Sequence, residues 1–233
     1  MKYAIVSDIH ANLEALTKAL AIIDDKHVDE IICLGDVVGY GANPNECVEI
    51  VRRNCTAVVL GNHDEAALDP AGPHDFNPIA QKAIEWTAAQ LTDESFSFLS
   101  SRTMIEKKEN ILLVHSSPHS PEAWDYIINA EEAADAIQYF EEMICFIGHT
   151  HVPGIFSVSG RSKSVSRTER QLVNVGSVGQ PRDGNPMLSF GIFDSTAWKY
   201  ELIRSEYNIQ LAAEKILKAG LPQELGYRLM YGM

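Results

Sequence analysis

The sequence predicts an α/β (α+β) fold in a single domain that spans residues 1–233. In the first 150 residues, short apolar runs alternate with helical patterns, which is typical of parallel strands joined by crossover helices. After His151, apolar runs are separated by Gly, Ser and Pro clusters, which we interpret as an antiparallel meander. No repeat, low-complexity stretch or linker divides the chain, so one domain is the better prediction.

Helices are predicted from apolar residues at helical spacing and from start signals. In residues 12–25 the apolar face consists of Leu13, Leu16, Leu20 and Ile23. A helix to about residue 53 follows, because Asn43, Pro44 and Glu46 supply an N-cap, a first-position proline and a capping-box glutamate. From residue 65 to 101 we expect a helical insertion with a helix that begins near Pro78, and its face consists of Ile79, Ala83, Trp86 and Gln90. Another helix is expected over residues 130–140.

Strands are predicted where compact apolar runs are bounded by turn residues. In chain order these runs are Lys2–Ser7, Glu30–Leu34, Thr56–Leu60, Thr103–Lys107, Asn110–His115, Met143–Ile147, Ile155–Ser159, Gln171–Val175, Met187–Asp194 and Ala197–Ile203. A closing helix is expected over Asn208–Ala219, with Gly220 as the residue that stops it. The tail, residues 221–231, is apolar enough to dock either on its own domain or on a second subunit, which leaves a homo-oligomer open.

The composition excludes several classes of protein. Lys and Arg number 19 and Asp and Glu number 32, so the net charge of −13 disfavours long nucleic acid or an anionic membrane as a partner. No apolar run approaches the ~20 residues of a membrane span, and Asp8 comes too early for a signal peptide, so we expect a cytoplasmic protein. The four cysteines are scattered without a CxxC pair and are expected to be reduced core residues.

Potential metal ligands follow directly after five of the predicted strands. The segments are Ser7-Asp8-Ile9-His10, Gly35-Asp36, Gly61-Asn62-His63-Asp64, Val114-His115 and Gly148-His149-Thr150-His151. Five of the eight histidines lie in these segments. Because ligands bind beyond the carboxyl ends of parallel strands, we expect the five strand ends to converge.

Seven of these side chains are candidate metal ligands, namely Asp8, His10, Asp36, Asn62, His115, His149 and His151. Imidazole, carboxylate and amide donors without a thiolate suit Mn, Fe, Co, Ni, Zn or Mg, and seven donors are enough for two ions ~3.5–4 Å apart. Taken singly, each has a simpler interpretation: Asp8 or Asp36 as a turn former or helix cap, His115 as a core histidine, and the glycine-containing segments as loops. The occurrence of all five segments together favours a metal site.

In this order the motifs D-x-H, G-D, G-N-H-D, a strand-terminal H and G-H-T-H resemble the calcineurin-like metallophosphoesterases, over the stretch from Asp8 to His151. The resemblance implies a four-layer αββα sandwich, in which two mixed β-sheets are flanked by helices. It also implies two divalent metal ions, with Mn as the first choice, in two ligand groups that share one bridging carboxylate. These are Asp8, His10 and His151 for one ion, Asn62, His115 and His149 for the other, and Asp36 for both.

A two-metal site implies phosphoester hydrolysis without a protein nucleophile, because a bridging water is acidified to hydroxide and attacks phosphorus in line. His63 resembles the family's histidine that protonates the leaving group or stabilises the transition state. In the phosphoprotein phosphatases of this superfamily the second motif reads G-D-x-x-D-R-G, whereas Gly39 and Tyr40 stand here in place of the later acid and arginine. His63 therefore lacks its usual carboxylate partner, and the clamp that favours a phosphomonoester is missing.

The residues that bind the substrate are less clearly marked. The segment 174–184 resembles one in small bacterial phosphoesterases related to diadenosine tetraphosphatases, and its Arg182 could replace the missing phosphate clamp. The alternative is an arginine that pairs with Asp183 or another acid in a turn. Asn12, Tyr40 and His74 are weaker candidates, because a helix cap, packing and a loop surface are their simpler roles.

These observations predict a dinuclear metal-dependent phosphodiesterase or phosphoanhydride hydrolase that acts on a nucleotide-like small molecule, for example a dinucleoside polyphosphate. Two alternatives stay open. One is a phosphomonoesterase or protein phosphatase, and the other is a noncatalytic protein-interaction scaffold, as in the retromer subunit of the same superfamily. Activity with added Mn²⁺ that a chelator abolishes distinguishes an enzyme from a scaffold. A nuclease on long polymers is disfavoured by the acidic charge.

Overall fold

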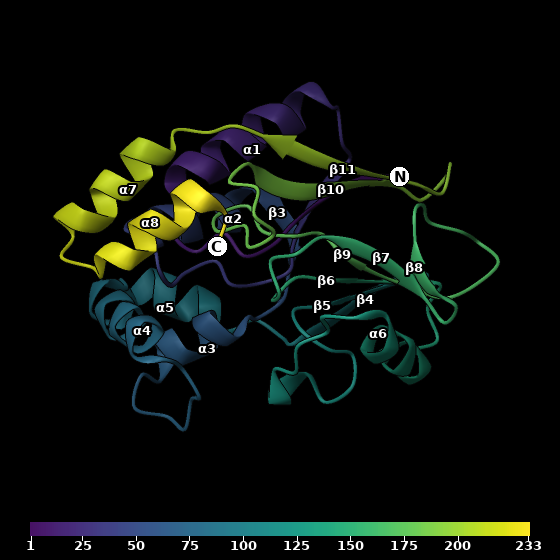
Figure 1. Cartoon of the computed structure of the whole chain (residues 1–233), viewed down its shortest axis with the longest axis horizontal. Coiled ribbons are helices and arrows are strands. Elements are labelled where there is room, and N and C mark those ends of the chain that lie inside the picture. Colours follow the sequence, from purple (N-terminus) through teal and green to yellow (C-terminus); the bar gives the residue numbers. More distant parts are fainter.

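Two β-sheets pack face to face in the computed structural model, which describes all residues, 1–233 (Figure 1). The first sheet has the order β11-β10-β1-β2-β3 and consists of β1 (Lys2–Val6), β2 (Glu30–Cys33), β3 (Cys55–Val58), β10 (Leu188–Asp194) and β11 (Lys199–Ser205). The second has the order β4-β5-β6-β9-β7-β8 and consists of β4 (Ile105–Lys108), β5 (Ile111–Val114), β6 (Ile144–Ile147), β7 (Gly154–Ser157), β8 (Gly160–Ser162) and β9 (Gln171–Asn174). Both sheets are mixed.

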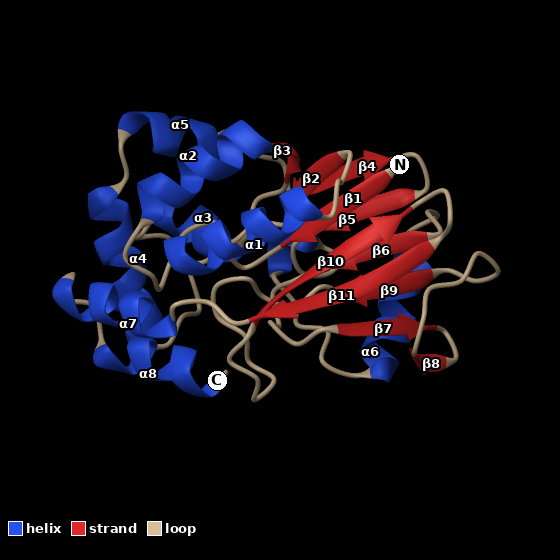
Figure 2. Cartoon of the chain, turned by 90° about the horizontal axis from the view of Figure 1, so that it is seen from above, coloured by secondary structure: helices blue, strands red, loops and turns tan.

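Eight α-helices flank the sheets. They are α1 (Leu13–Asp25), α2 (Pro44–Asn54), α3 (Asn62–Leu68), α4 (Pro78–Gln90), α5 (Asp93–Ser100), α6 (Ala130–Ala136), α7 (Ile209–Lys218) and α8 (Gln223–Tyr231). In Figure 1, α1 lies above the first sheet and α6 below the second, which gives the four-layer αββα sandwich that the family resemblance implied. Figure 2 shows most of the other helices gathered beyond one end of the strands. No helix is both long enough and apolar enough to cross a membrane.

Alternation along the strands separates the apolar layers. In β1, Tyr3 and Ile5 face the second sheet, whereas Ala4 and Val6 face α1, as the period of two in a strand requires. The layer between the sheets buries Phe146 together with residues from both sheets. Both sides of the central strands are thus covered by apolar side chains, which holds the strand ends in fixed positions relative to one another.

The prediction of an antiparallel meander after His151 is wrong. β9 lies between β6 and β7, parallel to β6 and antiparallel to β7, whereas β10 and β11 form a hairpin at the edge of the first sheet. Periodicity could not reveal this, because the four residues of β9 are all buried and so form the continuous apolar run that is typical of a central strand. The short edge strand β8 was also missed.

The capping box predicted at Asn43 is wrong, although Pro44 does begin α2. The Asn43 amide donates a hydrogen bond to Glu46 Oε1 at 2.8 Å, and its side-chain oxygen accepts one from Lys215 Nζ at 3.1 Å. The lysine of α7 therefore occupies the oxygen that would have capped α2. The helix expected over residues 130–140 is α-helical only to Ala136 and continues as a 3₁₀ turn.

The remaining predicted helices and strands are present in the structure, with bounds that differ by a few residues. All four cysteines are free, and three of them are buried. The apolar tail forms α8, which packs on its own chain through Leu225 and Leu229 against Ala212 and Ile216 of α7.

Candidate metal centre

The loops that follow β1, β2, β3, β5 and β6 meet at one end of the sheets and bring all seven predicted ligands together. Their donor atoms form two groups, each with all of its atoms within 4.8 Å of one another, which are Asp8, His10, Asp36 and His151, and Asp36, His115 and His149. Asn62 joins the second group, because its Oδ1 lies 3.2 Å from His115 Nε2. Asp36 belongs to both groups, which is the position that a bridging carboxylate needs.

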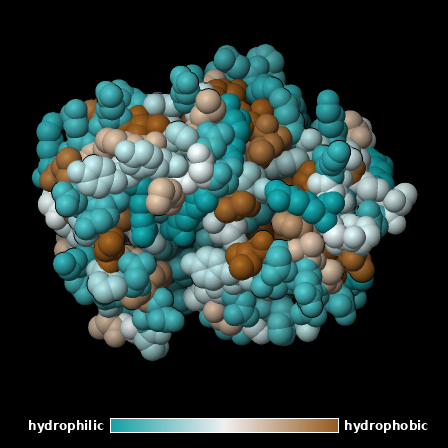
Figure 3. Space-filling view, in the orientation of Figure 1, coloured by the Kyte–Doolittle hydropathy of each residue, from teal (hydrophilic) through white to brown (hydrophobic).

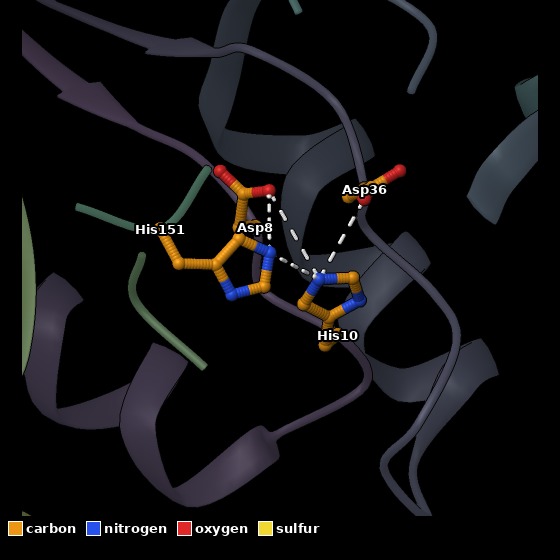
Figure 4. A group of neighbouring side chains, drawn as sticks. All are labelled: Asp8, His10, Asp36 and His151. Carbon is orange, nitrogen blue, oxygen red and sulfur yellow. Dashed lines mark hydrogen bonds and ion pairs between the residues drawn. The ribbon is translucent and has the colours of Figure 1, made fainter. Parts of the chain in front are cut away.

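The first group is drawn in Figure 4, where two imidazoles point at two carboxylates. Nε2 of His151 lies 3.1 Å from Asp8 Oδ1, and Nε2 of His10 lies 3.6 Å from Asp36 Oδ2. The two Nε2 atoms are 3.1 Å apart. A buried set of two nitrogens and two carboxylate oxygens that face a common point is suited to a divalent cation.

The second group has the same chemistry on the other side of Asp36. His115 Nε2 lies 3.4 Å from Asp36 Oδ2, and His149 Nδ1 lies 3.2 Å from His115 Nε2. Together with the Asn62 oxygen, these atoms supply two nitrogens, an amide oxygen and a carboxylate. The residues present therefore fit two metal ions that share Asp36.

Backbone carbonyls orient the histidines. Nδ1 of His10 lies 3.1 Å from Val38 O, Nδ1 of His115 lies 2.7 Å from Leu34 O, and Nδ1 of His151 lies 2.5 Å from Gln180 O. A carbonyl oxygen only accepts, so each Nδ1 carries the proton and each Nε2 presents its lone pair to the centre. His149 is reversed, because its Nε2 donates to Trp124 O at 2.9 Å and leaves Nδ1 free for a metal.

Five of the ligands have left-handed backbone conformations, which non-glycine residues rarely adopt. They are Asp8, His10, Asp36, His149 and His151, with φ between 49° and 65°. Each such residue costs roughly 1–3 kcal/mol, so the surrounding contacts must hold it in place. Buried turns of this kind at the strand ends indicate that the loops are shaped for the ligands rather than for stability.

Glycine at position 148 allows the His149 loop to approach β1 closely. A Cβ built on Gly148 would collide with Ser7 Oγ and Asp8 Oδ2, and the neighbouring His149 N–H donates to Asp8 Oδ2 at 3.1 Å. We therefore expect Gly148→Ala to displace Asp8 and to weaken metal binding by roughly 10–100-fold, measured as the ions retained after gel filtration. The control is Gly226→Ala on α8, whose new methyl group would make ordinary contacts with Ala213. Full metal content in the Gly148 variant would contradict this role.

Charge at the centre is arranged for cations. Burial raises the pKa of Asp36, but His115 and His63 outweigh it and hold that pKa well below its usual range. Burial lowers the pKa of His115, and the Asp36 carboxylate beside it reverses the effect and raises the pKa to about 9. Burial lowers the pKa of His149 to about 3. The buried carboxylates therefore favour positive charge at this point, which bound metal ions would supply.

His63 lies beside the two groups but outside them. It is buried on α3, with the rings of Tyr40, Phe76 and His10 at centroid distances of 4.4, 4.8 and 4.9 Å. Its Nδ1 is buried without a hydrogen-bond partner, and a Cβ on Gly39 would lie only 2.7 Å from that atom. No carboxylate therefore bonds Nδ1 of His63 in the structure. Burial lowers the pKa of His63 to about 4, so its imidazole is neutral near pH 7.

Two of the weaker candidates have structural roles. The Asn12 side chain caps α1 by accepting from Ala15 N at 3.1 Å, and its amide donates to Gly179 O at 2.8 Å. Tyr40 packs between His10 and His63, with its ring 4.7 and 4.4 Å from theirs. These contacts agree with the capping and packing interpretations.

Arg182 does not form the ion pair with Asp183 or another acid that was the alternative to a substrate-binding role. Its guanidinium donates to Gln180 Oε1 at 2.9 Å, whereas Asp183 pairs with Arg204. His74 lies at the edge of the cleft with its Nε2 2.8 Å from Asp69 O. Arg182 is thus left facing the cleft beside the metal ligands.

Sequence reasoning missed two residues that support the centre. Asp64 accepts hydrogen bonds from Val38 N at 3.0 Å and Gly61 N at 3.2 Å and so joins two ligand loops. Its place three residues into the G-N-H-D turn is a capping signal that could have identified it. Trp124, whose carbonyl orients His149, lies in an irregular loop and carries no comparable signal.

A cleft of about 1060 Å³ opens beside the second ligand group. In Figure 3 the surface is hollowed between the helical half of the molecule and the half that carries the sheets. Three kinds of residue line the cleft. They are Asn62, His63 and His149 of the centre, the aromatic residues Tyr40, Phe76, Trp124 and Tyr126, and the arginines Arg182 and Arg228. This volume suffices for a substrate of nucleotide size.

The two-sheet sandwich with N and O donors at its strand ends defines a metallophosphoesterase. The chain belongs to the calcineurin-like phosphoesterase superfamily, whose domain model matches residues 1–197. An uncharacterized protein of Methanocaldococcus jannaschii is 41% identical over 98% of this chain and 97% of its own length. A symmetrical bis(5′-nucleosyl)-tetraphosphatase of Erwinia tasmaniensis is 26% identical over 59% of this chain and 51% of its own length.

Solved structures agree with this assignment. The crystal structure of a metallophosphoesterase from Sphaerobacter thermophilus has a TM-score of 0.90 and 39% identity, over 100% of this chain and 99% of that one. The crystal structure of a hypothetical protein from Pyrococcus horikoshii has a TM-score of 0.85 and 20% identity, over 100% of this chain and 98% of that one. At this identity the likeness supports the shared fold and no shared activity. The chain is therefore a phosphoesterase of the hydrolase class, and the two ligand groups form a cluster suited to metal binding.

Proposed function

We propose that this protein is a dinuclear metal-dependent phosphodiesterase or phosphoanhydride hydrolase that acts on a nucleotide-like small molecule. The observation that carries the proposal is the convergence of seven buried N and O donors beside the cleft, with Asp36 common to both groups. Membership of the calcineurin-like superfamily supports phosphoester hydrolysis as the reaction class.

Seven residues of the chain would bind the metal ions, and His63 would act on the substrate. Asp8, His10 and His151 would hold one ion, Asn62, His115 and His149 the other, and Asp36 both. When bound, two divalent ions, with Mn²⁺ as our first choice, supply an acidified water and neutralise charge on the phosphoryl oxygens. His63 would donate an N–H hydrogen bond to the reacting phosphoryl group, because its neutral imidazole lies beside the ligands and lines the cleft.

The surroundings of the centre support a nucleotide-like substrate. Phe76, Trp124 and Tyr126 line the cleft, and the Tyr126 side chain is 53% exposed with its ring 4.1 Å from that of His149. Stacking of a base on such a ring contributes roughly 1–3 kcal/mol. The likeness to the tetraphosphatase of Erwinia tasmaniensis supports a dinucleoside polyphosphate as one candidate.

A preference for diesters over monoesters tests the reaction class. Gly39 and Tyr40 leave no acid or arginine where a monoester clamp would be, so we expect bis-p-nitrophenyl phosphate to be hydrolysed with at least about 10-fold higher kcat/KM than p-nitrophenyl phosphate. Turnover should require added Mn²⁺ and should stop when a chelator is added. A strong monoester preference would overturn the diesterase assignment and favour a phosphomonoesterase or protein phosphatase.

The noncatalytic scaffold is the second function class, and the intact ligand set together with His63 disfavours it. Inertness toward every diester, anhydride and monoester at saturating metal would favour the scaffold instead. We also propose the cytoplasm as the compartment, because all four cysteines are free and a reducing compartment keeps thiols in that state.

A further inference from the structure

Two arginines of the cleft have no acidic partner. The Arg182 guanidinium donates to the amide oxygen of Gln180 at 2.9 Å and lies against Tyr40, but it contacts no carboxylate. Arg228, half-buried on α8, makes neither a side-chain hydrogen bond nor an ion pair, although it lines the same cleft. Both guanidinium groups line the same cleft as Asn62, His63 and His149, and no carboxylate neutralises either of them, so together they are suited to bind an anion from outside the protein.

Both arginines lie on the side of the cleft next to Tyr40. The Arg182 guanidinium carbon lies 5.6 Å from the Tyr40 ring centroid, and that ring lies 4.4 Å from the ring of His63. The backbone N–H of Arg182 also donates to His151 O at 3.3 Å, which fixes the arginine to a ligand loop. Burial raises the pKa of Tyr40, and both guanidinium groups oppose that shift, so the hydroxyl experiences positive potential from each of them.

Acidic side chains come from other elements around the cleft. They are Glu65, Asp69, Asp75, Glu122 and Asp125, which belong to α3, to the loop before α4 and to the loop after β5. These carboxylates repel a polyanion, which leaves the Arg182 and Arg228 side as the favourable place for negative charge.

We propose that Arg182 and Arg228 form a second anion subsite, which binds a phosphate group next to the one held at the metal centre. The inference rests on the proposed function and narrows its substrate class to molecules with two or more linked phosphoryl groups, such as nucleoside diphosphates and polyphosphates. Arg228 lies beyond residues 1–197, which match the superfamily model, so the C-terminal helix supplies half of this specificity.

The test compares ADP with AMP, because the two nucleotides differ by one phosphate. Isothermal titration of the Mn²⁺-loaded protein at constant free metal gives both Kd values, with the α,β-methylene analogue used for ADP so that its phosphate linkage is not hydrolysed during the titration. We expect Arg182→Ala and Arg228→Ala each to weaken ADP binding by roughly 10-fold or more and to weaken AMP binding much less. Arg228→Lys, which retains the charge but not the planar fork, should recover part of the loss. An ADP-to-AMP affinity ratio equal to that of the wild type in both alanine variants would overturn the subsite.

The matched control is Lys218→Ala, which removes a positive charge from the end of α7, where the side chain is 78% exposed and outside the cleft. It should leave both Kd values unchanged. Hydrolysis of bis-p-nitrophenyl phosphate by the wild type tests the proposed function separately, since that substrate has a single phosphorus. If the wild type hydrolyses the diester but the two alanine variants keep the wild-type ratio of ADP to AMP affinity, only the subsite is overturned. If the variants lose ADP affinity selectively but the wild type hydrolyses no phosphoester, only the proposed function is overturned.

Discussion

Asp36→Asn should reduce the bound metal from two ions to at most one per chain and lower turnover by at least roughly 10²–10³-fold. Asp36 Oδ2 lies 3.6 Å from His10 Nε2 and 3.4 Å from His115 Nε2, so one oxygen faces both ligand groups. An amide is neutral and a poor bridging ligand, and its NH₂ group would face the imidazoles or the cations. Elemental analysis and steady-state kinetics measure the two effects.

The control for Asp36→Asn is Asp25→Asn, which makes the same chemical change at the exposed end of α1 and should alter neither quantity. Asp36 Oδ1 also accepts from His63 N at 2.8 Å, so circular dichroism must show that the variant retains its helices. A folded Asp36→Asn variant that holds two ions would remove Asp36 as the bridge and would leave the proposed two-metal mechanism without its central ligand.

The ligands were predictable because each one follows a strand whose apolar run is visible in the sequence. Once β1 and β2 are recognised as parallel neighbours, Asp8 and Asp36 must emerge at the same sheet edge. The assignment of His115 and His149 to one group was not reachable from spacing and came from the family resemblance. The structure places them together, with 3.2 Å between their nearest ring nitrogens.

What supports the ligands was not predictable from the sequence. The carbonyls of Leu34, Val38 and Gln180 orient three imidazoles, but every residue has a carbonyl and only the folded loops decide which one is used. The left-handed conformation of Asp8 likewise opposes local preference and is imposed by tertiary contacts.

Fold prediction failed where a choice between sheets was required. An apolar run identifies β9 as a strand but does not say that it inserts beside β6. Arg228 could not be placed in the cleft for a related reason, because the docking of α8 depends on contacts with α7 that sequence spacing leaves open. The prediction of one domain over residues 1–233 stays a prediction.

His63→Ala should lower kcat by roughly 10²–10⁴-fold while metal content stays at that of the wild type. His63 is not within either donor group, and it touches the centre only through its backbone N–H and its ring contacts with His10 and Tyr40. Loss of the ring therefore removes a transition-state interaction without removing a ligand. The control is His119→Ala, an exposed histidine stacked on Tyr139, which should leave kcat unchanged.

The leaving group distinguishes the two roles that His63 can have. If His63 gives a proton to the departing oxygen, the decrease in kcat in His63→Ala should be large for a methyl phosphodiester. It should be small for a p-nitrophenyl diester, whose leaving group is stable without a proton. If the ring donates a hydrogen bond to the phosphoryl oxygens, His63→Ala should lower kcat by the same factor for both substrates. Because burial lowers its pKa to about 4 and no carboxylate holds Nδ1, we expect equal losses. A loss confined to the methyl ester would show that substrate binding supplies the protonated imidazole, and normal turnover of both esters would remove His63 from the mechanism.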